Sequence, residues 1–373
     1  MLYFWMAWEA WLASRGVFLA LEPYADDPRW KDWYIPPTTA PAAHPYAHRA
    51  RAEDKFPKWR VDMPTRRLAY AQDAQHRDLV LKLTNTDSHE CKAYERLLQS
   101  VNNGDGSTCV GVLCPTAILQ TPHNFCFVVM PRWGPLGKLD ELESVREIGQ
   151  FMRCTSKDVQ ESNMVVNCYC PDILYPNLLG AVLPQHRRTG DVHYSLIDFD
   201  ISLCLPMETS LTAYRRPSWE AYLGTPLYHT QDVDFGERDY NPFAYDVGSL
   251  GNFYRIWFWI AVPFVPQLAP LFDKMTTHVV AERLTAAEAA EFVDTIFAQL
   301  SDSVLDTPVN LTPNEDCLIN PDLYWSQTTP QFRDAWALYK TPGMCFGARL
   351  LDWILDKPVG WRTIKFLRRA LRI

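Results

Sequence analysis

The sequence predicts an α+β fold of two lobes, a small β-rich lobe followed by a larger helical lobe. Strand-like runs are concentrated between residues 66 and 130, and helical patterns dominate beyond residue 139. The length of 373 residues allows about two domains at roughly 150 residues each. Hydrophobic residues make up 47% of the chain and charged residues 21%, which predicts a folded chain with packed cores.

An N-terminal extension is expected over residues 1–65. Its first twenty residues are apolar and helix-like, but they contain Glu9 and Arg15 and lack a basic start, so we do not expect a signal peptide. The Pro- and His-rich stretch at 35–59 has few β-branched residues. It predicts an extended arm that lies on another part of the protein.

The β-rich lobe is expected over residues 66–130. Short strands are predicted at 66–73 and 78–84, and a buried strand that ends in proline is predicted at 125–133. An amphipathic helix is predicted at 88–101, because five apolar side chains recur there at helical spacing: Ala93, Tyr94, Leu97, Leu98 and Val101.

The helical lobe is expected over residues 131–300, with a surface insertion at 168–192 and a strand at 193–199. A C-terminal helical extension over 301–373 follows. Helical patterns recur in four tracts, at 243–261, 284–300, 331–340 and 344–372. The apolar run 256–271 contains three prolines, so it predicts a buried core helix and a loop rather than a membrane span.

The composition bears on two questions, whether the protein binds nucleic acid and whether its compartment is oxidising or reducing. The net charge is −8, with 36 Lys and Arg against 44 Asp and Glu, which excludes a general nucleic-acid binder because phosphate neutralisation needs a basic face. Ten cysteines are too few for a disulfide scaffold. A reducing, cytoplasmic location is therefore expected.

Several polar motifs follow one another in a fixed order. Lys82 lies inside the apolar run LVLKL, where a charge is costly unless it is paired or faces a cleft. Glu90 follows on the predicted helix. Then come SKDVQESN at 156–163, an apolar strand that ends in Asp-Phe-Asp at 198–200, and DVGSLG at 246–251.

In this order the motifs resemble those of the eukaryotic protein kinase superfamily, and in particular the divergent kinase-like proteins of mushroom-forming fungi. The resemblance covers roughly residues 66–300, and the aromatic N-terminus is also similar to the extensions of those fungal proteins. It implies a two-lobed protein kinase-like fold, ATP and Mg²⁺ as cofactors, and a protein as substrate or binding partner.

The resemblance implies roles for individual side chains. Lys82 and Glu90 would form the pair that holds the ATP phosphates, with Glu95 as the alternative partner. The catalytic-loop pattern H-R-D-x-x-x-x-N is matched by S-K-D-V-Q-E-S-N. Asp158 would therefore accept the proton of the substrate hydroxyl, and Asn163 would bind a metal ion.

Further roles follow from the later motifs. Asp198 begins an Asp-Phe-Asp triplet where the family has Asp-Phe-Gly, and it would ligate Mg²⁺. Asp246 matches the buried aspartate that anchors the catalytic loop from the helical lobe. Arg283 stands in the place of a structural arginine.

The run VVMPRWG resembles the hinge between the lobes. Met130 would lie near the gatekeeper position, and the backbone of Pro131, Arg132 and Trp133 would lie beside an adenine. Pro131 has no N–H group, so one hinge donor is missing.

The chain also departs from the family pattern. No glycine occurs between residues 51 and 81, so a Gly-rich loop over the phosphates is absent. Ser156 and Lys157 replace a His and an Arg, and Lys is the poorer bidentate partner. Asp200 replaces a glycine. The tract 134–157 supplies about four helical turns where the family has two helices.

Phosphoryl transfer needs mainly a cation, metal ligands and a carboxylate near the nucleophile, and all these side-chain types are present. We therefore expect transfer from ATP to protein Ser/Thr hydroxyls. The alternative is a pseudokinase, a nucleotide-binding or scaffold module without turnover, which the absent glycine loop, the altered triplet and the short helical tract favour. Phosphorylation of a small molecule is a third hypothesis.

Two further features, a group of Cys and His residues and a basic C-terminal tail, could have a function but are expected to be structural. Cys168-x-Cys170 with Cys154, His186 and His193 could bind zinc, but the spacing lacks a second C-x-x-C and we predict no zinc site. The basic and apolar tail could lie on an anionic membrane. We predict instead a terminal helix that packs on the helical lobe.

Overall fold

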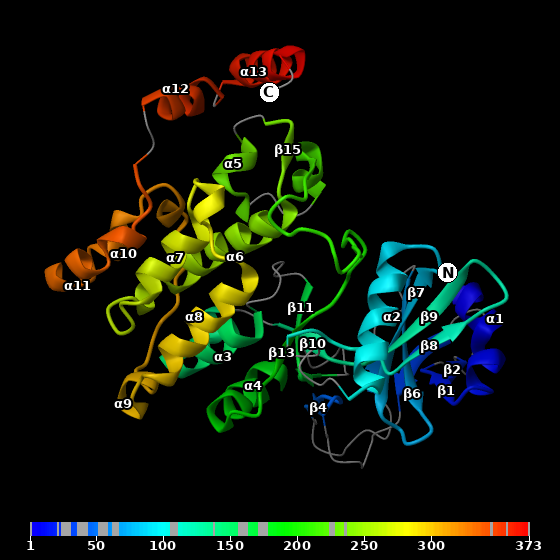
Figure 1. Ribbon diagram of the computed structural model, residues 1–373. Helices are drawn as coiled ribbons and strands as arrows, with labels where there is room; N and C mark the ends of the chain where they lie inside the picture. Colours follow the sequence, from blue (N-terminus) through cyan, green and yellow to red (C-terminus); the bar gives the residue numbers. More distant parts are fainter. Residues whose placement is uncertain are drawn as a thin grey trace. The chain divides into compact units, whose positions relative to one another are not determined.

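A computed structural model describes most of the chain (Figure 1). The described residues are 2–20, 22–23, 31–35, 44–50, 59–61, 67–104, 111–136, 139–155, 163–170, 178–223, 228–234, 237–343, 346–355 and 357–371.

The fold is α+β, as expected, and the chain divides into two compact units. The first contains Met1–Gly137 and Ser162–Cys204, and the second contains Lys138–Glu161 and Leu205–Ile373. The division therefore falls after Gly137 rather than after residue 130. Residues 162–204 belong to the first unit, not with the helical segments.

The first unit is built on a five-stranded antiparallel sheet. The strands run in the order β1-β6-β7-β9-β8, which are Val17–Leu19, Leu68–Asp73, Asp78–Asn85, Phe125–Pro131 and Ala117–Gln120. The predicted strands at 66–73, 78–84 and 125–133 are confirmed as β6, β7 and β9. The edge strands β1 and β8 were not predicted, because each is short and has no marked alternation.

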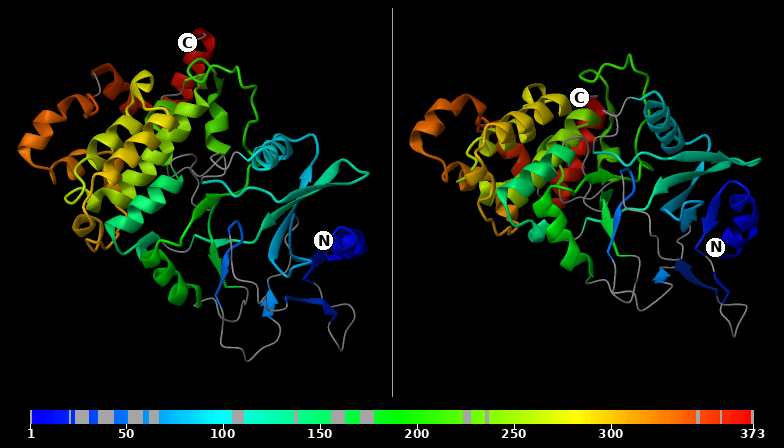
Figure 2. Two further views of the ribbon diagram at one scale, coloured as in Figure 1. Left: turned by 60° about the horizontal axis from the view of Figure 1, so that its bottom comes forward. Right: turned by 90° about the horizontal axis from the view of Figure 1, so that it is seen from below.

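Two helices cover opposite faces of this sheet (Figure 2, right view). Successive side chains of a strand point to opposite faces. Leu81 and Phe127 accordingly pack with Trp5 of α1 (Leu2–Ala13), whereas Val128 packs with Cys91 and Tyr94 of α2 (His89–Asn102). This alternation places Lys82, the neighbour of Leu81, on the face that α2 covers.

Shorter strands complete the first unit. A three-stranded antiparallel sheet has the order β10-β11-β13, and β12 pairs in parallel with β4 of the N-terminal extension. Strands β10, β11 and β13 are Gly134–Pro135, Met164–Val166 and Tyr194–Leu196, and β12 and β4 are Cys168–Tyr169 and His48–Arg49. Helix α4 is Leu178–Thr189. A separate sheet is formed by β2 (Glu22–Pro23), β3 (Lys31–Ile35) and β5 (Trp59–Val61).

The predicted insertion at 168–192 is not confined to the surface. Cys168 and Leu183 are fully buried, and the side chain of Arg187 is buried beside Tyr194. Gly134 shows how closely β10 approaches β12, because a Cβ added there would lie 2.2 Å from the carbonyl oxygen of Cys168. The tract is thus part of the packed first unit.

The second unit is mainly helical, as expected, with α6 packed along α7. Its helices are α3 (Val145–Thr155), α5 (Gln231–Asp234), α6 (Pro242–Phe258), α7 (Leu268–Thr276), α8 (Ala286–Ala298), α9 (Asp302–Leu305), α10 (Asp322–Trp325), α11 (Pro330–Ala335), α12 (Phe346–Leu355) and α13 (Pro358–Leu371). Short 3₁₀ turns and one two-stranded sheet complete it: η2 (Leu139–Glu141), η4 (Ser218–Leu223), η6 (Trp259–Ala261), η7 (Val280–Glu282), η8 (Glu315–Leu318), η9 (Ala337–Tyr339), β14 (Arg216–Pro217) and β15 (Asp239–Tyr240).

The apolar run 256–271 forms the end of α6, a turn and the start of α7, and most of its side chains are buried. Across the described ranges, no helix has both the length and the apolar character that crossing a membrane requires. Cys114 is disulfide-bonded, which the small number of cysteines did not predict.

Candidate functional site

Lys82 is the centre of a charged cluster in the first unit. It lies in the middle of β7 and is only 5% exposed. Its ammonium group forms ion pairs with Oε1 of Glu90 and Oδ1 of Asp198. A buried ammonium is tolerated only where opposite charges compensate its lost hydration. Both partners are residues that the sequence motifs had singled out.

Glu90 reaches Lys82 because of where α2 begins. Ser88 caps the helix, and its hydroxyl accepts a hydrogen bond of 3.0 Å from the backbone N–H of Cys91. Glu90 therefore lies in the first turn, where the helix dipole favours a negative charge. Glu95, the alternative partner, lies one turn further along and its carboxylate faces Gln120 at 3.5 Å. The contact with Lys82 belongs to Glu90.

Asp198 is positioned by the pairing of β11 with β13. Met164 stands opposite Leu196, and the backbone N–H of Ile197 donates to the carbonyl oxygen of Asn163 at 2.8 Å. Asn163 and Asp198 are therefore neighbours at the same end of this strand pair. Asp198 adopts a φ of 70°, a left-handed conformation that is uncommon for a residue other than glycine. Such backbone is often found at functional sites.

Arg67 joins the cluster, and sequence reasoning missed it. Its guanidinium donates to Oε2 of Glu90 at 2.5 Å and lies 3.9 Å from Oδ2 of Asp200. Asp200, which stands where the resemblance implies a glycine, thus has a cationic neighbour. The signal that could have indicated Arg67 is its position just before β6, the strand adjacent to β7 in the sheet.

Aromatic packing holds the Asp-Phe-Asp segment against α2. The ring of Phe199 meets Tyr94 edge-on, with 5.2 Å between the ring centroids. Tyr94 is fully buried, and burial, assisted by the nearby charge of Glu90, raises the pKa of its phenol above the usual value. Tyr94 is thus a neutral, apolar support for the charged cluster.

The cluster carries more negative than positive charge. Two cations, Lys82 and Arg67, face three carboxylates, those of Glu90, Asp198 and Asp200. The side chain of Asp198 is 41% exposed, so its carboxylate is anchored by Lys82 and still accessible. Together with the amide oxygen of the neighbouring Asn163, it offers the hard oxygen ligands that Mg²⁺ prefers. These side chains therefore fit the metal that the motifs imply.

The hinge residues are placed less favourably for a nucleotide base. Pro131 ends β9 opposite Leu79, and the backbone N–H of Arg132 donates to the carbonyl oxygen of Asp78 at 3.0 Å. The guanidinium of Arg132 lies 3.9 Å from the centroid of the Tyr70 ring. Neither residue thus has a backbone N–H available for a base.

The other two hinge residues belong to the core. Met130 is 4% exposed and packs in the same cluster as Tyr94 and Trp133. The indole N–H of Trp133 donates to the carbonyl oxygen of Pro45 at 2.7 Å, which ties the hinge to the N-terminal extension. Met130 and Trp133 of the predicted hinge are therefore buried side chains that support the fold.

Two further predicted residues, Asp246 and Arg283, fall in the second unit. Asp158 lies outside the described residues. Asp246, on α6, is exposed, in contrast to the buried position that the resemblance implied. Arg283 is buried, forms an ion pair of 2.6 Å with Asp232, and donates to the carbonyl oxygen of Ala244. Its contacts are those of a structural residue.

The candidate zinc ligands do not form one group. His186 stacks on His48 with 4.4 Å between the ring centroids, and His193 meets His44 at 5.7 Å. Burial raises the pKa of the Cys168 thiol to about 11. Within the described parts of the chain, no set of three or more His, Cys, Asp or Glu side chains is arranged to hold a metal ion.

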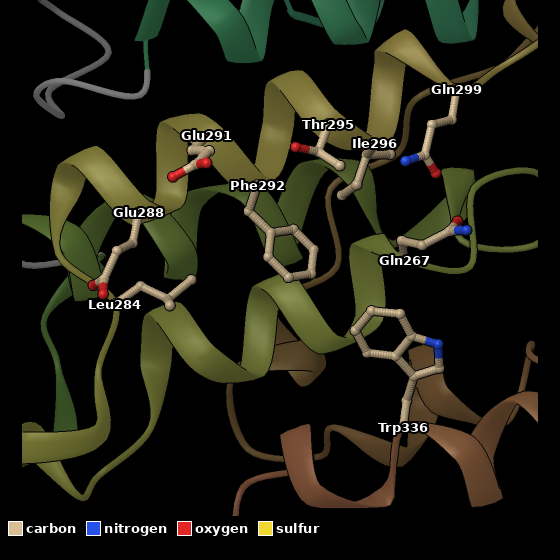
Figure 3. Close-up of a pocket in the computed structure, with 9 residues that line it drawn as sticks. All are labelled: Gln267, Leu284, Glu288, Glu291, Phe292, Thr295, Ile296, Gln299 and Trp336. Carbon is tan, nitrogen blue, oxygen red and sulfur yellow. The ribbon is translucent and has the colours of Figure 1, made fainter.

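Each unit also contains a cavity. In the first, about 510 Å³ lies beside the end of α2 and is lined mainly by apolar side chains that include Leu98, Leu113 and Trp133. In the second, about 440 Å³ lies along α8 (Figure 3), where Phe292 points toward Trp336.

Acidic side chains line one part of the second cavity. Glu288 is held by Thr285 in a capping box, which lowers the pKa of its carboxyl, so it is ionised at neutral pH. Glu291 also lines the cavity, and the described residues that line it include no Lys or Arg. The described lining of this cavity is thus partly apolar and partly acidic.

No model of a known protein family matches the sequence, and no curated protein matches it either. The assignment of a function therefore rests on the residues of the site.

Proposed function

We propose that the protein is a kinase-like, Mg²⁺-dependent nucleotide-binding protein that transfers the terminal phosphoryl group of ATP to a protein Ser or Thr hydroxyl. The observation that carries the proposal is the joint ion pairing of buried Lys82 with Glu90 and Asp198. A lysine on a sheet strand paired with a helix glutamate, beside a metal-binding aspartate, is the arrangement that kinases use for phosphates.

The chemistry assigns a distinct task to each side chain. Lys82 neutralises charge on the phosphates, and Glu90 orients Lys82. Asp198 and Asn163 would hold Mg²⁺, and the ion would supply positive charge against the phosphate oxygens. Asp158 accepts the proton of the attacking hydroxyl while a bond forms from that oxygen to the terminal phosphorus. The bond from the phosphorus to the ADP oxygen breaks, and ADP leaves with the electron pair.

A second candidate function is a kinase-like binding module without turnover. The observation that favours it is the hinge, where Pro131 has no N–H and the N–H of Arg132 is bonded to Asp78. A base would lose the backbone donors that these positions otherwise offer, so nucleotide affinity would be low. The absence of glycine between residues 51 and 81 acts in the same direction.

Thermal unfolding of the purified full chain tests nucleotide binding. ATP with Mg²⁺ should raise the melting temperature more than ATP or Mg²⁺ alone, because a ligand at 100 times its Kd adds about 2.7 kcal/mol of stability. Lys82→Ala and Asp198→Asn should abolish the increase. Circular dichroism of each variant without ligand checks that it is folded.

Phosphate transfer separates the two candidates. An active kinase should label itself or dephosphorylated casein from radiolabelled ATP, and Asp158→Asn should keep the thermal shift but lose the labelling. A thermal shift without labelling would favour the binding module. The absence of both in a folded sample would contradict nucleotide binding altogether.

A further inference from the structure

The two C-terminal helices expose an unusual number of large apolar side chains. In α12 these are Phe346, Leu350 and Trp353, and in α13 they are Val359, Phe366 and Leu367. Phe346, Val359 and Phe366 are each at least 70% exposed. Exposed apolar residues scattered singly are normal, but a concentration on adjacent elements marks an interaction surface. The predicted packing of this segment on the helical unit therefore leaves these apolar side chains unexplained.

The exposed residues form stripes at helical spacing. Phe346, Leu350 and Trp353 are related by i, i+4 and i+7, and Val359 and Phe366 by i and i+7, so each set lies on one face of its helix. The other faces have neighbours. Ile354 and Ile364 are partly buried, and Arg368 lies 3.6 Å from Glu237.

The charge of this segment is opposite to that of the rest of the chain. Residues 346–373 contain seven Lys and Arg and two Asp, a net charge of +5, although the whole chain carries −8. Arg349 and Arg362 are exposed beside the apolar stripes. A strong local reversal of sign combined with an apolar face is typical of helices that lie on anionic lipid.

The same charges argue against two other partners for this surface, a second copy of the chain and a nucleic acid. In a symmetric dimer the same patch faces itself, which would bring +5 against +5. Nucleic acid would satisfy the basic residues but leave the apolar side chains without a partner, since phosphate contacts are polar.

We propose that α12 and α13 bind the surface of an anionic membrane. The apolar side chains of Trp353, Phe366 and Phe346 enter the boundary between headgroups and acyl chains, where aromatic rings are favoured. Arg349 and Arg362 remain at headgroup level and pair with lipid phosphates or carboxylates. The binding localises the protein without spanning the bilayer. It does not depend on the proposed phosphoryl transfer.

Co-sedimentation of the full chain with vesicles tests the proposal. Binding to vesicles of phosphatidylcholine mixed with phosphatidylserine should exceed binding to phosphatidylcholine alone by about tenfold or more, and added salt should reduce it. The double variant Trp353→Ser with Phe366→Ser should lose most of the binding. Ile319→Ser, which removes an apolar side chain that is 85% exposed elsewhere in the second unit, should keep it.

Several outcomes would overturn the proposal. The wild-type chain could fail to sediment with the phosphatidylserine vesicles, or bind both vesicle types equally. Ile319→Ser could weaken binding as much as the double variant. Light scattering could show a dimer that the double variant abolishes, and the surface would then belong to a second copy. If a variant fails to fold, the dependence of wild-type binding on anionic lipid and on salt still tests the proposal.

Discussion

Lys82 and Asp198 are 116 residues apart in the sequence and form an ion pair in the first unit. Lys82 is supplied by β7 in the centre of the five-stranded sheet, and Asp198 by the chain that follows β13. Glu90 completes the contact from α2. A strand, a helix and a left-handed loop residue thus converge on one buried ammonium group.

Glu90 and Glu95 offer a matched pair for testing the site. Glu90→Gln should weaken binding of ATP with Mg²⁺ by about tenfold, a cost of about 1.4 kcal/mol, because Lys82 loses the carboxylate that orients it. Glu95→Gln should leave binding unchanged, since Glu95 does not contact Lys82. Titration calorimetry of both variants measures the difference. Equal losses would contradict the assigned role of Glu90.

The buried ion pair between Arg49 of β4 and Asp78 of β7 should contribute strongly to the free energy of unfolding. Both side chains are 4% exposed, and Asp78 also accepts a hydrogen bond of 2.8 Å from Gln72. Asp78→Ala should lower the free energy of unfolding by up to about 3–5 kcal/mol, because the buried guanidinium of Arg49 loses this carboxylate and Gln72 loses a hydrogen-bond acceptor.

The exposed pair between Asp322 and Lys340 is the control for that measurement. Asp322→Ala should cost at most about 1 kcal/mol, since exposed ion pairs contribute little. Urea denaturation followed by circular dichroism compares the two variants. A loss for Asp78→Ala as small as that of the control would show that the Arg49 pair is solvated.

The stacked pair of His48 and His186 should make stability depend on pH. Burial and then the neighbouring His186 lower the pKa of His48, whereas Asp191 acts weakly in the opposite direction. The native state therefore binds fewer protons than the unfolded chain just below the ordinary value of 6.5. Stability from this group is complete above that pH and is lost as the pH falls below it.

Melting temperatures measured above and below pH 6.5 check the sign of this effect. His48→Asn removes the titrating group, so it should reduce the fall in stability toward acid pH. A stability that rises on acidification in the wild type, but not in His48→Asn, would contradict the predicted direction.

Two helical glycines should respond oppositely to alanine. Gly149 of α3 faces Phe297, and an added Cβ would lie 2.4 Å from its ring, so Gly149→Ala should destabilise by about 1–3 kcal/mol through overpacking. Among the described residues, no atom lies within 4 Å of such a Cβ at Gly180 of α4. Gly180→Ala should stabilise by up to about 1 kcal/mol through helix propensity. Urea denaturation measures both, and destabilisation by Gly180→Ala would be the contrary result.

The local elements could be predicted because their signals lie in neighbouring residues. Strands β6, β7 and β9 follow from short apolar runs, and α2 follows from its apolar stripe. The contact of Lys82 with Glu90 was expected only from the resemblance of the motifs to those of protein kinases, which left Glu95 as the alternative partner. The roles of these residues in phosphate chemistry stay predictions.

Other parts of the site could not be read from the sequence. The Arg67 ion pair depends on the side-by-side pairing of β6 with β7. The exposure of Asp246 depends on which face of α6 is covered. The hydrogen bond from Arg132 to Asp78 depends on how far the β7–β9 ladder extends. None of these relations has a signature in a window of consecutive residues.

By itself, the sequence determined the α+β class, the positions of the main strands and helices, and the charged residues that needed partners. Periodicity and burial cost are properties of neighbouring residues, so these features are local. Only the tertiary structure decided that the chain leaves the first unit after Gly137 and returns at Ser162, and that β4 pairs with β12. Such pairings join strands over a hundred residues apart, and they depend on the path of the whole chain and on the packing that it allows.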